Sequence, residues 1–280
     1  MGRQRVDDDR WWSLCRRHDW PGVLEAFFRC VHEQEIAVDD ALVRRLLVAQ
    51  MPQFADRALK IVEPWGTDNA IWRLGVDLVV RLPRIHWAAG QIEREAHWLP
   101  RLAPYLPVAV PDPIAVGTSS DEYPYPWAVH RWIPGESAAL ERIDDPTAFA
   151  RDLAEVVRKL QTAPTAGAPP ASNRARALRD YDAATREAID GASRLIDAPA
   201  ALDVWEAALA APPHEGPPVW VQGDLEGNCL VRDGRLCAIV DWGSACVGDP
   251  AVDWRGPVAI DRVAPGVRGC QQRRAHRLVR

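Results

Sequence analysis

The first half of the chain alternates short apolar runs with turn residues. The runs are LKIVEP (59–64), AIWRLG (70–75) and DLVVRLPR (77–84), followed later by PIAVG (113–117) and PWAVHRWIPGE (126–136). β-Branched runs of this length, bounded by Gly, Pro, Asn and Asp, predict strands. Because the first three follow one another through short turns, we expect them to form an antiparallel meander.

Apolar positions spaced three or four residues apart predict helices. Before the first strand, ALVRRLLVAQMPQF follows two aspartates and ends near Pro52, with Leu42, Leu46 and Leu47 on one face. Further helices are expected at 87–102, 147–163, about 177–190 and about 199–211. The Pro/Ala-rich stretch 162–173 is typical of a flexible linker.

Two more apolar runs lie near the end of the patterned region. VWV (219–221) and LCAIV (236–240) have the composition of buried strands, and Asp233-Gly234 is a hairpin turn signal. We therefore expect 219–221 and 236–240 to form one hairpin.

Oxygen-bearing side chains follow both of these runs. Asp224 and Asn228 come after the first run, and Asp241 comes directly after the second. A carboxylate can accept the proton of an attacking hydroxyl, while carboxylate and amide oxygens can hold Mg²⁺ against phosphates. The pattern predicts a site for phosphoryl transfer.

The segment VWVQGDLEGNCLVRDGRLCAIVDWGSACVGDPAVD (219–253) resembles the catalytic and metal motifs of the aminoglycoside phosphotransferase family. Those motifs run roughly HGDLxxxN, IDWG or IDFG, and GDPxxD. The resemblance implies a bilobal protein-kinase-like α+β fold, with a small antiparallel-sheet N-lobe and a mainly helical C-lobe. It implies a catalytic base at Asp224 and Mg²⁺ ligands at Asn228 and Asp241. Asp249 and Asp253 would be the acidic residues of the last motif.

The chain departs from the family pattern at two points. Gln222 stands where the family has His, and Asp224 and Asn228 are separated by three residues instead of four. In the family the His organises the loop, and Gln also donates and accepts hydrogen bonds. A shorter loop can displace the Asn, and a shift of about 1 Å can cost about 10²-fold in rate.

The resemblance also assigns a nucleotide-binding region in the N-lobe. Its first hairpin would cover the nucleotide phosphates, where Gly66 lets the backbone approach and Thr67 and Asn69 offer donors. Arg81 occupies the position of the family's phosphate-binding Lys, and Glu95 matches the ion-pair partner of that Lys. A guanidinium holds phosphate bidentately and keeps its charge, so we expect Arg81 to replace the Lys.

The run PWAVHRWIPGE would become the hinge between the lobes. Backbone groups near His130, Arg131 and Trp132 would then face the base of ATP or GTP. The His130 side chain itself is expected to be a surface or hinge group and not a catalyst.

We expect four segments: an N-terminal extension (1–34), an N-lobe (35–132), a C-lobe (133–254) and an atypical basic tail (255–280). The first 34 residues have only loose periodicity, and the resemblance implies a start near residues 31–36. The stretch would be an extension, an accessory helix or, as we favour, the result of a misplaced translation start. The last 26 residues are rich in Arg and lack a sustained apolar period. A frameshift or truncation would explain them.

Composition restricts the environment and the partners. With 48% hydrophobic and 26% charged residues, the 280-residue chain has the composition of a soluble globular protein. A net charge of −5 gives no nucleic-acid footprint and is compatible with a cationic acceptor. No apolar run approaches the roughly 18 residues of a membrane span, and no signal peptide is evident, so a cytoplasmic protein is expected. The six cysteines lack CxxC spacing and are expected to be reduced.

These observations predict a kinase for small molecules. It would transfer the γ-phosphate of ATP or GTP, with Mg²⁺, to a hydroxyl of an aminoglycoside-like acceptor. A macrolide, choline or a homoserine-like alcohol stays open as acceptor. The alternatives are an inactive pseudo-kinase that binds nucleotide or ligand, and a truncated product without function.

Overall fold

The computed structural model describes residues 35–62, 68–138, 143–171, 174–225 and 227–254. The expected extension (1–34), the basic tail (255–280) and the loop residues Gly66 and Thr67 lie outside the described residues. The chain divides into two compact units. The first unit holds the described residues up to Trp98 together with Pro111–Trp132, and the second holds Leu99–Val110 and the described residues from Ile133 onward.

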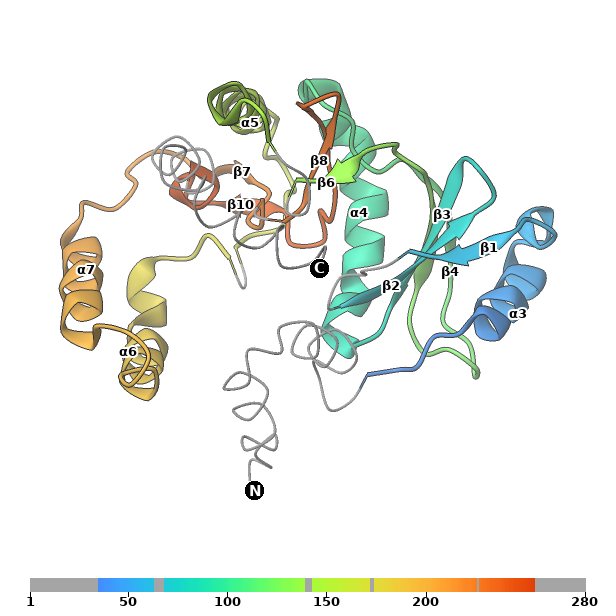
Figure 1. The fold of residues 1–280 in the computed structure, drawn as a ribbon, viewed down its shortest axis with the longest axis horizontal. Helices are drawn as coiled ribbons and strands as arrows, with labels where there is room; N and C mark the ends of the chain where they lie inside the picture. The colour runs from blue at the N-terminus through green and yellow to red at the C-terminus, as the bar shows by residue number, and fades with distance from the viewer. Residues whose placement is uncertain (1–34, 63–67, 139–142, 172–173, 226, 255–280) are drawn as a thin grey trace, which may run out of the picture. The chain divides into compact units, whose positions relative to one another are not determined.

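A five-stranded antiparallel sheet forms the first unit (Figure 1). Its strands are β1 (Leu59–Ile61), β2 (Asn69–Leu74), β3 (Leu78–Pro83), β4 (Pro113–Gly117) and β5 (Trp127–Arg131), in the order β1-β2-β3-β5-β4. Gly75, with φ +64°, lies in the turn between β2 and β3, in a backbone conformation that glycine adopts without strain. The predicted meander is confirmed.

Helix α3 (Asp40–Gln50) packs on one face of this sheet and contacts β1 (Figure 1). It begins at Asp39, whose side chain accepts a hydrogen bond from the amide of Leu42 at 2.8 Å. The predicted apolar face is buried together with Trp72 and Val80 of the sheet. Strand side chains alternate between faces, so Arg81, the neighbour of Val80, is directed to the opposite face.

Helix α4 (Ala89–Leu102) follows a 3₁₀ turn at His86–Ala88. It matches the helix predicted at 87–102, and its residues Ile92 and Glu95 are buried. The polar side chain of Glu95 is therefore enclosed in the first unit and requires a partner there.

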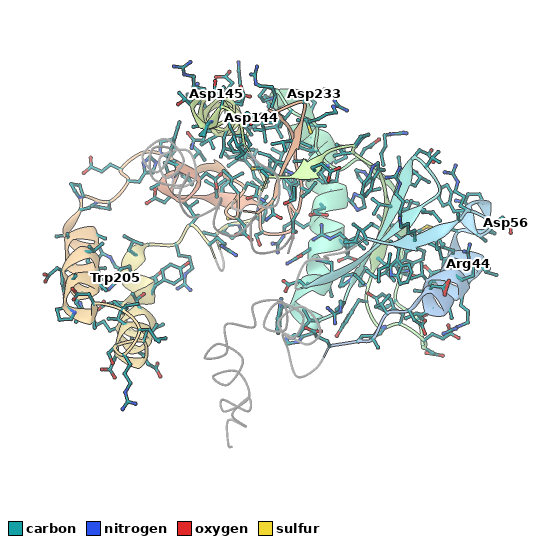
Figure 2. All side chains as sticks on the ribbon, viewed as in Figure 1. Arg44, Asp56, Asp144, Asp145, Trp205 and Asp233 are labelled. Carbon is teal, nitrogen blue, oxygen red and sulfur yellow. The ribbon has the colours of Figure 1, made fainter. Side chains whose placement is uncertain are left out.

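Three helices of the second unit also match the sequence pattern. They are α5 (Pro146–Leu160), α6 (Asp182–Gly191) and α7 (Ala198–Ala210). Asp145, labelled in Figure 2, caps α5 by accepting from the amide of Ala148 at 3.0 Å, and Asp197 caps α7 in the same way. In the described part of the chain, no helix is long and apolar enough to cross a membrane.

The predicted hairpin of 219–221 with 236–240 is wrong. The strands of this region are β6 (Glu136–Ser137), β7 (Val219–Val221), β8 (Cys229–Arg232), β9 (Arg235–Ile239) and β10 (Cys246–Gly248). β8 and β9 form the hairpin, whereas β7 pairs with β10. The turn residues are Asp233, labelled in Figure 2, and Gly234, with φ +52° and +74°. A two-residue turn of this kind joins the strands directly beside it, and CLVR is that strand on the N-terminal side.

Part of the stretch expected to be a linker is hydrogen-bonded to β10. The amide of Ala171 donates to the Val247 carbonyl at 3.0 Å, and the amide of Val247 donates to the Pro169 carbonyl at 2.8 Å. The described end of the 162–173 segment is therefore fixed beside the strand that pairs with β7.

Candidate active site

Gln222 connects the two segments that carry the predicted catalytic residues. Its side chain is completely buried, at 0% exposure. The amide Nε2 donates to the Asp241 carbonyl at 2.7 Å, and Oε1 accepts from the amide of Asp224 at 2.6 Å. Gln222 thus uses both ends of its side chain to hold Asp241, two residues after β9, and the loop after β7 together.

Asp253 fixes the same loop from its other side. Its two carboxylate oxygens accept hydrogen bonds from the amides of Gln222 and Gly223, each at 2.7 Å. The Asp253 side chain is buried, and bonds from N–H groups to a carboxylate are stronger than neutral ones. Gly223 has φ +84°, which side-chain-bearing residues adopt only with strain.

Asn228 directly precedes β8 and Asp241 lies two residues after β9, at the same end of this strand pair. The amide of Val240 donates to the Asn228 carbonyl at 2.9 Å, and Asn228 Nδ2 donates to the Asp224 carbonyl at 2.7 Å. Because Nδ2 of Asn228 donates to the Asp224 carbonyl, Oδ1 is the side-chain atom that can bind a ligand. Asp241 adopts φ +55°, a strained conformation for a residue other than glycine that is frequent at functional sites.

An amide oxygen and a carboxylate oxygen form a donor set that fits Mg²⁺. Both Asn228 and Asp241 are half-buried, so their side chains remain accessible. Among the residues that the structure describes, no group of three or more His, Cys, Asp or Glu side chains gathers as a metal site. An ion held by these two residues would therefore need phosphate and water oxygens to complete its coordination, as Mg²⁺ does with nucleotides.

Arg174 contacts the predicted catalytic base. Its Nη1 lies 3.2 Å from Asp224 Oδ1 and donates to the Gly223 carbonyl at 3.3 Å. Sequence analysis did not single out this residue, because it follows directly on the Pro/Ala-rich stretch and belongs to no recognisable motif.

Arg81 and Glu95 form the ion pair that the resemblance implies. Arg81 Nη1 lies 2.6 Å from both carboxylate oxygens of Glu95, and Nη2 donates to Gln91 Oε1 at 3.2 Å. Both partners are buried. Two groups of α4 thus orient the guanidinium on the face of the sheet opposite α3, while its role in holding phosphate stays a prediction.

His130 is not the surface side chain that the sequence suggested. It is 3% exposed, on strand β5, which lies between β3 and β4 within the sheet. Neither ring nitrogen has a hydrogen-bond partner among the described residues. Burial, and after it the positive charge of Arg81, lowers the pKa of His130 from 6.5 to about 3. The imidazole is therefore neutral at physiological pH.

The backbone amides expected to face a nucleotide base are engaged within the first unit. The amide of Arg131 donates to the Asp112 carbonyl at 2.9 Å, and that of Trp132 donates to the Asp77 carbonyl at 2.8 Å. A base would have to meet other backbone groups of this segment. Asn69, expected in the phosphate-binding turn, is instead the first residue of β2 and is buried.

Acidic side chains predominate on α6 and α7. They are Asp182, Glu187, Asp190, Asp203 and Glu206, against the single basic residue Arg186. Arg186 pairs with Asp182 at 2.8 Å and with Glu206 at 2.5 Å, and Trp205 Nε1 on α7 (Figure 2) donates to Asp182 at 2.7 Å. The Trp205 hydrogen bond, together with Arg186, lowers the pKa of Asp182. The remaining carboxylates leave this helix pair with an excess of negative charge.

A family model described as the phosphotransferase enzyme family (APH) matches residues 62–254, which is more than half of the chain. The chain belongs to the phosphotransferase enzyme family. The recognition and the kinase-like α+β fold predicted from the sequence are thereby confirmed, as is the class of enzyme, a phosphotransferase.

Solved structures of similar fold come from two branches of phosphotransferases. The GDP and kanamycin complex of APH(2")-IIia has a TM-score of 0.62 and 21% identity over 78% of this chain and 82% of its own. The apoenzyme of the macrolide 2'-phosphotransferase MphH from Brachybacterium faecium has a TM-score of 0.51 and 27% identity over 72% and 76%. No curated protein matches the sequence.

The match to the phosphotransferase enzyme family ends at residue 254 and so includes Asp224, Asn228, Asp241 and Asp253. Nucleotides are present in several related structures, among them the ADP-bound APH(2'')-Ib and the streptomycin and ATP complex of APH(2")-IIa, each 18% identical to this chain. These nucleotides belong to those structures, and the roles of individual residues in this chain stay predictions.

Proposed function

We propose that this phosphotransferase transfers the γ-phosphoryl group of ATP or GTP to a hydroxyl of an aminoglycoside-like small molecule. The observation that carries the proposal is the bonded arrangement of Asp224, Asn228 and Asp241. Gln222 bonds to both Asp224 and Asp241, and Asn228 bonds back to the Asp224 carbonyl. Three oxygen-bearing side chains of the required types are thus held on one hydrogen-bonded scaffold.

In the proposed reaction Asp224 accepts the proton of the acceptor hydroxyl. The hydroxyl oxygen forms a bond to the γ-phosphorus, the bond from that phosphorus to the bridging oxygen breaks, and the nucleoside diphosphate leaves with the electron pair. Asn228 and Asp241 would hold Mg²⁺, which supplies neutralisation of phosphate charge. Arg81, oriented by Glu95, would contribute a positive charge that does not titrate.

The excess of carboxylates on α6 and α7 supports a cationic acceptor. Two of those five carboxylates are paired with Arg186, and the others are available to attract ammonium groups. An aminoglycoside carries several ammonium groups beside its hydroxyls and would gain from this charge. The APH(2")-IIia structure with kanamycin supports the same choice by fold, and the macrolide 2'-phosphotransferase makes a macrolide the second acceptor to test.

Thermal-shift titration with ATP and GTP, each with and without Mg²⁺, tests the nucleotide site. We expect a Mg²⁺-dependent rise in Tm for the wild-type chain. In Asp241→Asn this rise should be lost while Tm without ligand stays the same, because the substitution removes a charged metal ligand. Asp233→Asn, at the tip of the β8–β9 hairpin, is the matched control and should respond like wild type.

Turnover then separates an active kinase from a pseudo-kinase. The transfer of labelled phosphate to kanamycin or to a macrolide is expected in wild type and abolished in Asp241→Asn. A chain that is stabilised by nucleotide but phosphorylates neither acceptor would support the binding protein without activity. Retained transfer in Asp241→Asn would refute the metal assignment.

A further inference from the structure

The backbone at Arg174 and Ala175 contacts β10 and the residue that follows it. The amide of Asp249 donates to the Ala175 carbonyl at 3.3 Å, and the Cys246 thiol lies 4.0 Å from the Arg174 carbonyl. Ala175 adopts φ +57°, an uncommon conformation for alanine. The chain here is therefore held against β10, with the Arg174 side chain beside the loop that carries Asp224.

Two glycines allow this close approach. A Cβ atom on Gly223 would lie 3.2 Å from Arg174 Cβ, and one on Gly248 would lie 2.7 Å from both Ala175 Cβ and the Ala175 carbonyl oxygen. A side chain at Gly248 would displace the backbone that positions Arg174. The packing around Arg174 thus requires minimal side chains at two neighbouring positions.

Stabilising the fold does not account for this arrangement. The side chains of Arg174 and Asp224 are 38% and 37% exposed, and ion pairs in contact with water contribute little to stability. The guanidinium places a permanent positive charge directly beside the carboxylate that the proposed function assigns to the acceptor hydroxyl.

The chemistry of transfer brings negative charge to the same place. An acceptor hydroxyl bonded to Asp224 lies within about 2.6–3.2 Å of that carboxylate, and the phosphoryl group becomes attached to this hydroxyl oxygen. In the described part of the chain, the contacts of Arg174 both use Nη1, so Nε and Nη2 keep their donors for another acceptor. Guanidinium groups bind phosphoryl oxygens with two parallel hydrogen bonds.

We propose that Arg174 is a further catalytic residue, which pairs with Asp224 in the resting enzyme and binds the oxygens of the transferring phosphoryl group during reaction. This role rests on the proposed function of Asp224. The bonds formed and broken are those given above, and Arg174 neither gains nor loses a proton. Its contribution is positive charge where the transition state carries negative charge.

Steady-state kinetics of Arg174→Gln, Arg174→Lys and a control test this role. Mg-ATP and Mg-GTP serve as donors, with kanamycin, a macrolide or water as acceptor. Arg174→Gln should lower kcat by roughly 10²–10³-fold, the usual effect of removing one donor to a transition-state oxyanion, with a small change in nucleotide KM. Arg174→Lys keeps the charge but not the planar pair of donors, so it should recover part of the loss.

Arg176→Gln is the matched control. Arg176 lies two residues away and pairs at 3.1 Å with Asp180, which has no assigned role. The kcat of Arg176→Gln should equal that of wild type. A similar loss in Arg176→Gln and Arg174→Gln would assign the effect to the charge of the whole segment and refute the specific role.

A binding measurement without turnover separates catalysis from structure. Calorimetry would compare ADP or GDP, in the presence of Mg²⁺, with the same nucleotide plus aluminium fluoride, which imitates the transferring phosphoryl group. Arg174→Gln should weaken the aluminium fluoride complex by the factor seen in kcat and leave the affinity for the diphosphate unchanged. If Arg174→Gln weakens both complexes equally, or weakens neither while the wild-type enzyme is active, the role of Arg174 is overturned but the proposed function is not. A wild-type chain without any transfer would refute the proposed function, and this role with it.

Discussion

Replacing Asp253 by Asn tests whether the catalytic loop depends on one buried carboxylate. Asp253 is 2% exposed, and each of its oxygens accepts one backbone amide, from Gln222 and from Gly223. In Asp253→Asn one oxygen becomes an NH₂ group. Whichever way the side chain is turned, this NH₂ group faces an N–H donor.

The expected loss follows from these two bonds. A hydrogen bond to a charged group contributes about 1.5–3 kcal/mol, and a buried donor left without a partner costs about 1–3 kcal/mol. Because Asn keeps one of the two bonds in weaker form, we expect the free energy of unfolding to fall by about 2–4 kcal/mol. At roughly 2–4 °C per kcal/mol for a domain of this class, Tm should fall by about 5–15 °C.

Thermal unfolding followed by tryptophan fluorescence measures this loss, because the buried Trp220 on β7 adjoins the loop. The control is Asp249→Asn in the same Gly-Asp-Pro motif. Asp249 accepts from the amide of Ala251 at 2.9 Å in an exposed bond of the helix-capping type, for which Asn serves as well as Asp, so its effect should be below about 0.5 kcal/mol. Equal stabilities of Asp253→Asn and wild type would refute the view that this carboxylate fixes the loop.

Two further predictions concern the first unit. The pKa of His130 is lowered to about 3 in the folded state. Between pH 6.5 and 3, His130 therefore takes up a proton in the unfolded chain but not in the folded one. The free energy of unfolding should fall by about 1.4 kcal/mol for each pH unit in this range. Urea unfolding of the wild type should show a free energy of unfolding about 2 kcal/mol lower at pH 5 than at pH 7.5. This difference should disappear in His130→Phe and remain in the control His97→Gln, whose side chain is exposed. The same pH dependence of stability in His130→Phe as in wild type would contradict the assignment. Glu95→Gln leaves buried Arg81 without a counter-charge and should cost about 3–5 kcal/mol in urea unfolding. Exposed Glu93→Gln on the same helix should cost below about 0.5 kcal/mol, and a similar loss in both variants would disprove the importance of the buried pair.

Local signals determined the elements that sequence reasoning placed correctly. α3 begins at Asp39, whose side chain accepts from an amide of the first turn, and ends before Pro52. The strands of the first unit are bounded by turn residues, of which Gly75 takes the positive φ that the β2–β3 turn requires. In each case, the information lies within a few residues of the boundary.

The pattern of apolar and polar residues did not predict the pairings between segments that are distant in sequence. β7 pairs with β10 and not with β9. This pairing depends on the tertiary arrangement of the strands and not on the composition of VWV. His130 is buried, and its strand β5 lies between β3 and β4, a position that the order of strands along the chain does not reveal. Arg174 reaches Asp224 across 50 residues of sequence, from a position directly after a stretch whose composition indicated only a linker.

The two departures from the family pattern, which left an inactive protein open as an alternative, do not loosen the loop. A neutral His offers one donor and one acceptor, and Gln222 offers the same pair, used here on the Asp241 carbonyl and the Asp224 amide. The shorter loop still closes, since Asn228 Nδ2 reaches the Asp224 carbonyl at 2.7 Å and Gly227 supplies φ +84° just before it. A site released from function would have no reason to keep a fully buried polar side chain, which is costly unless every bond is made. The retention of these bonds around substituted residues therefore favours a working phosphotransferase over a relic of one.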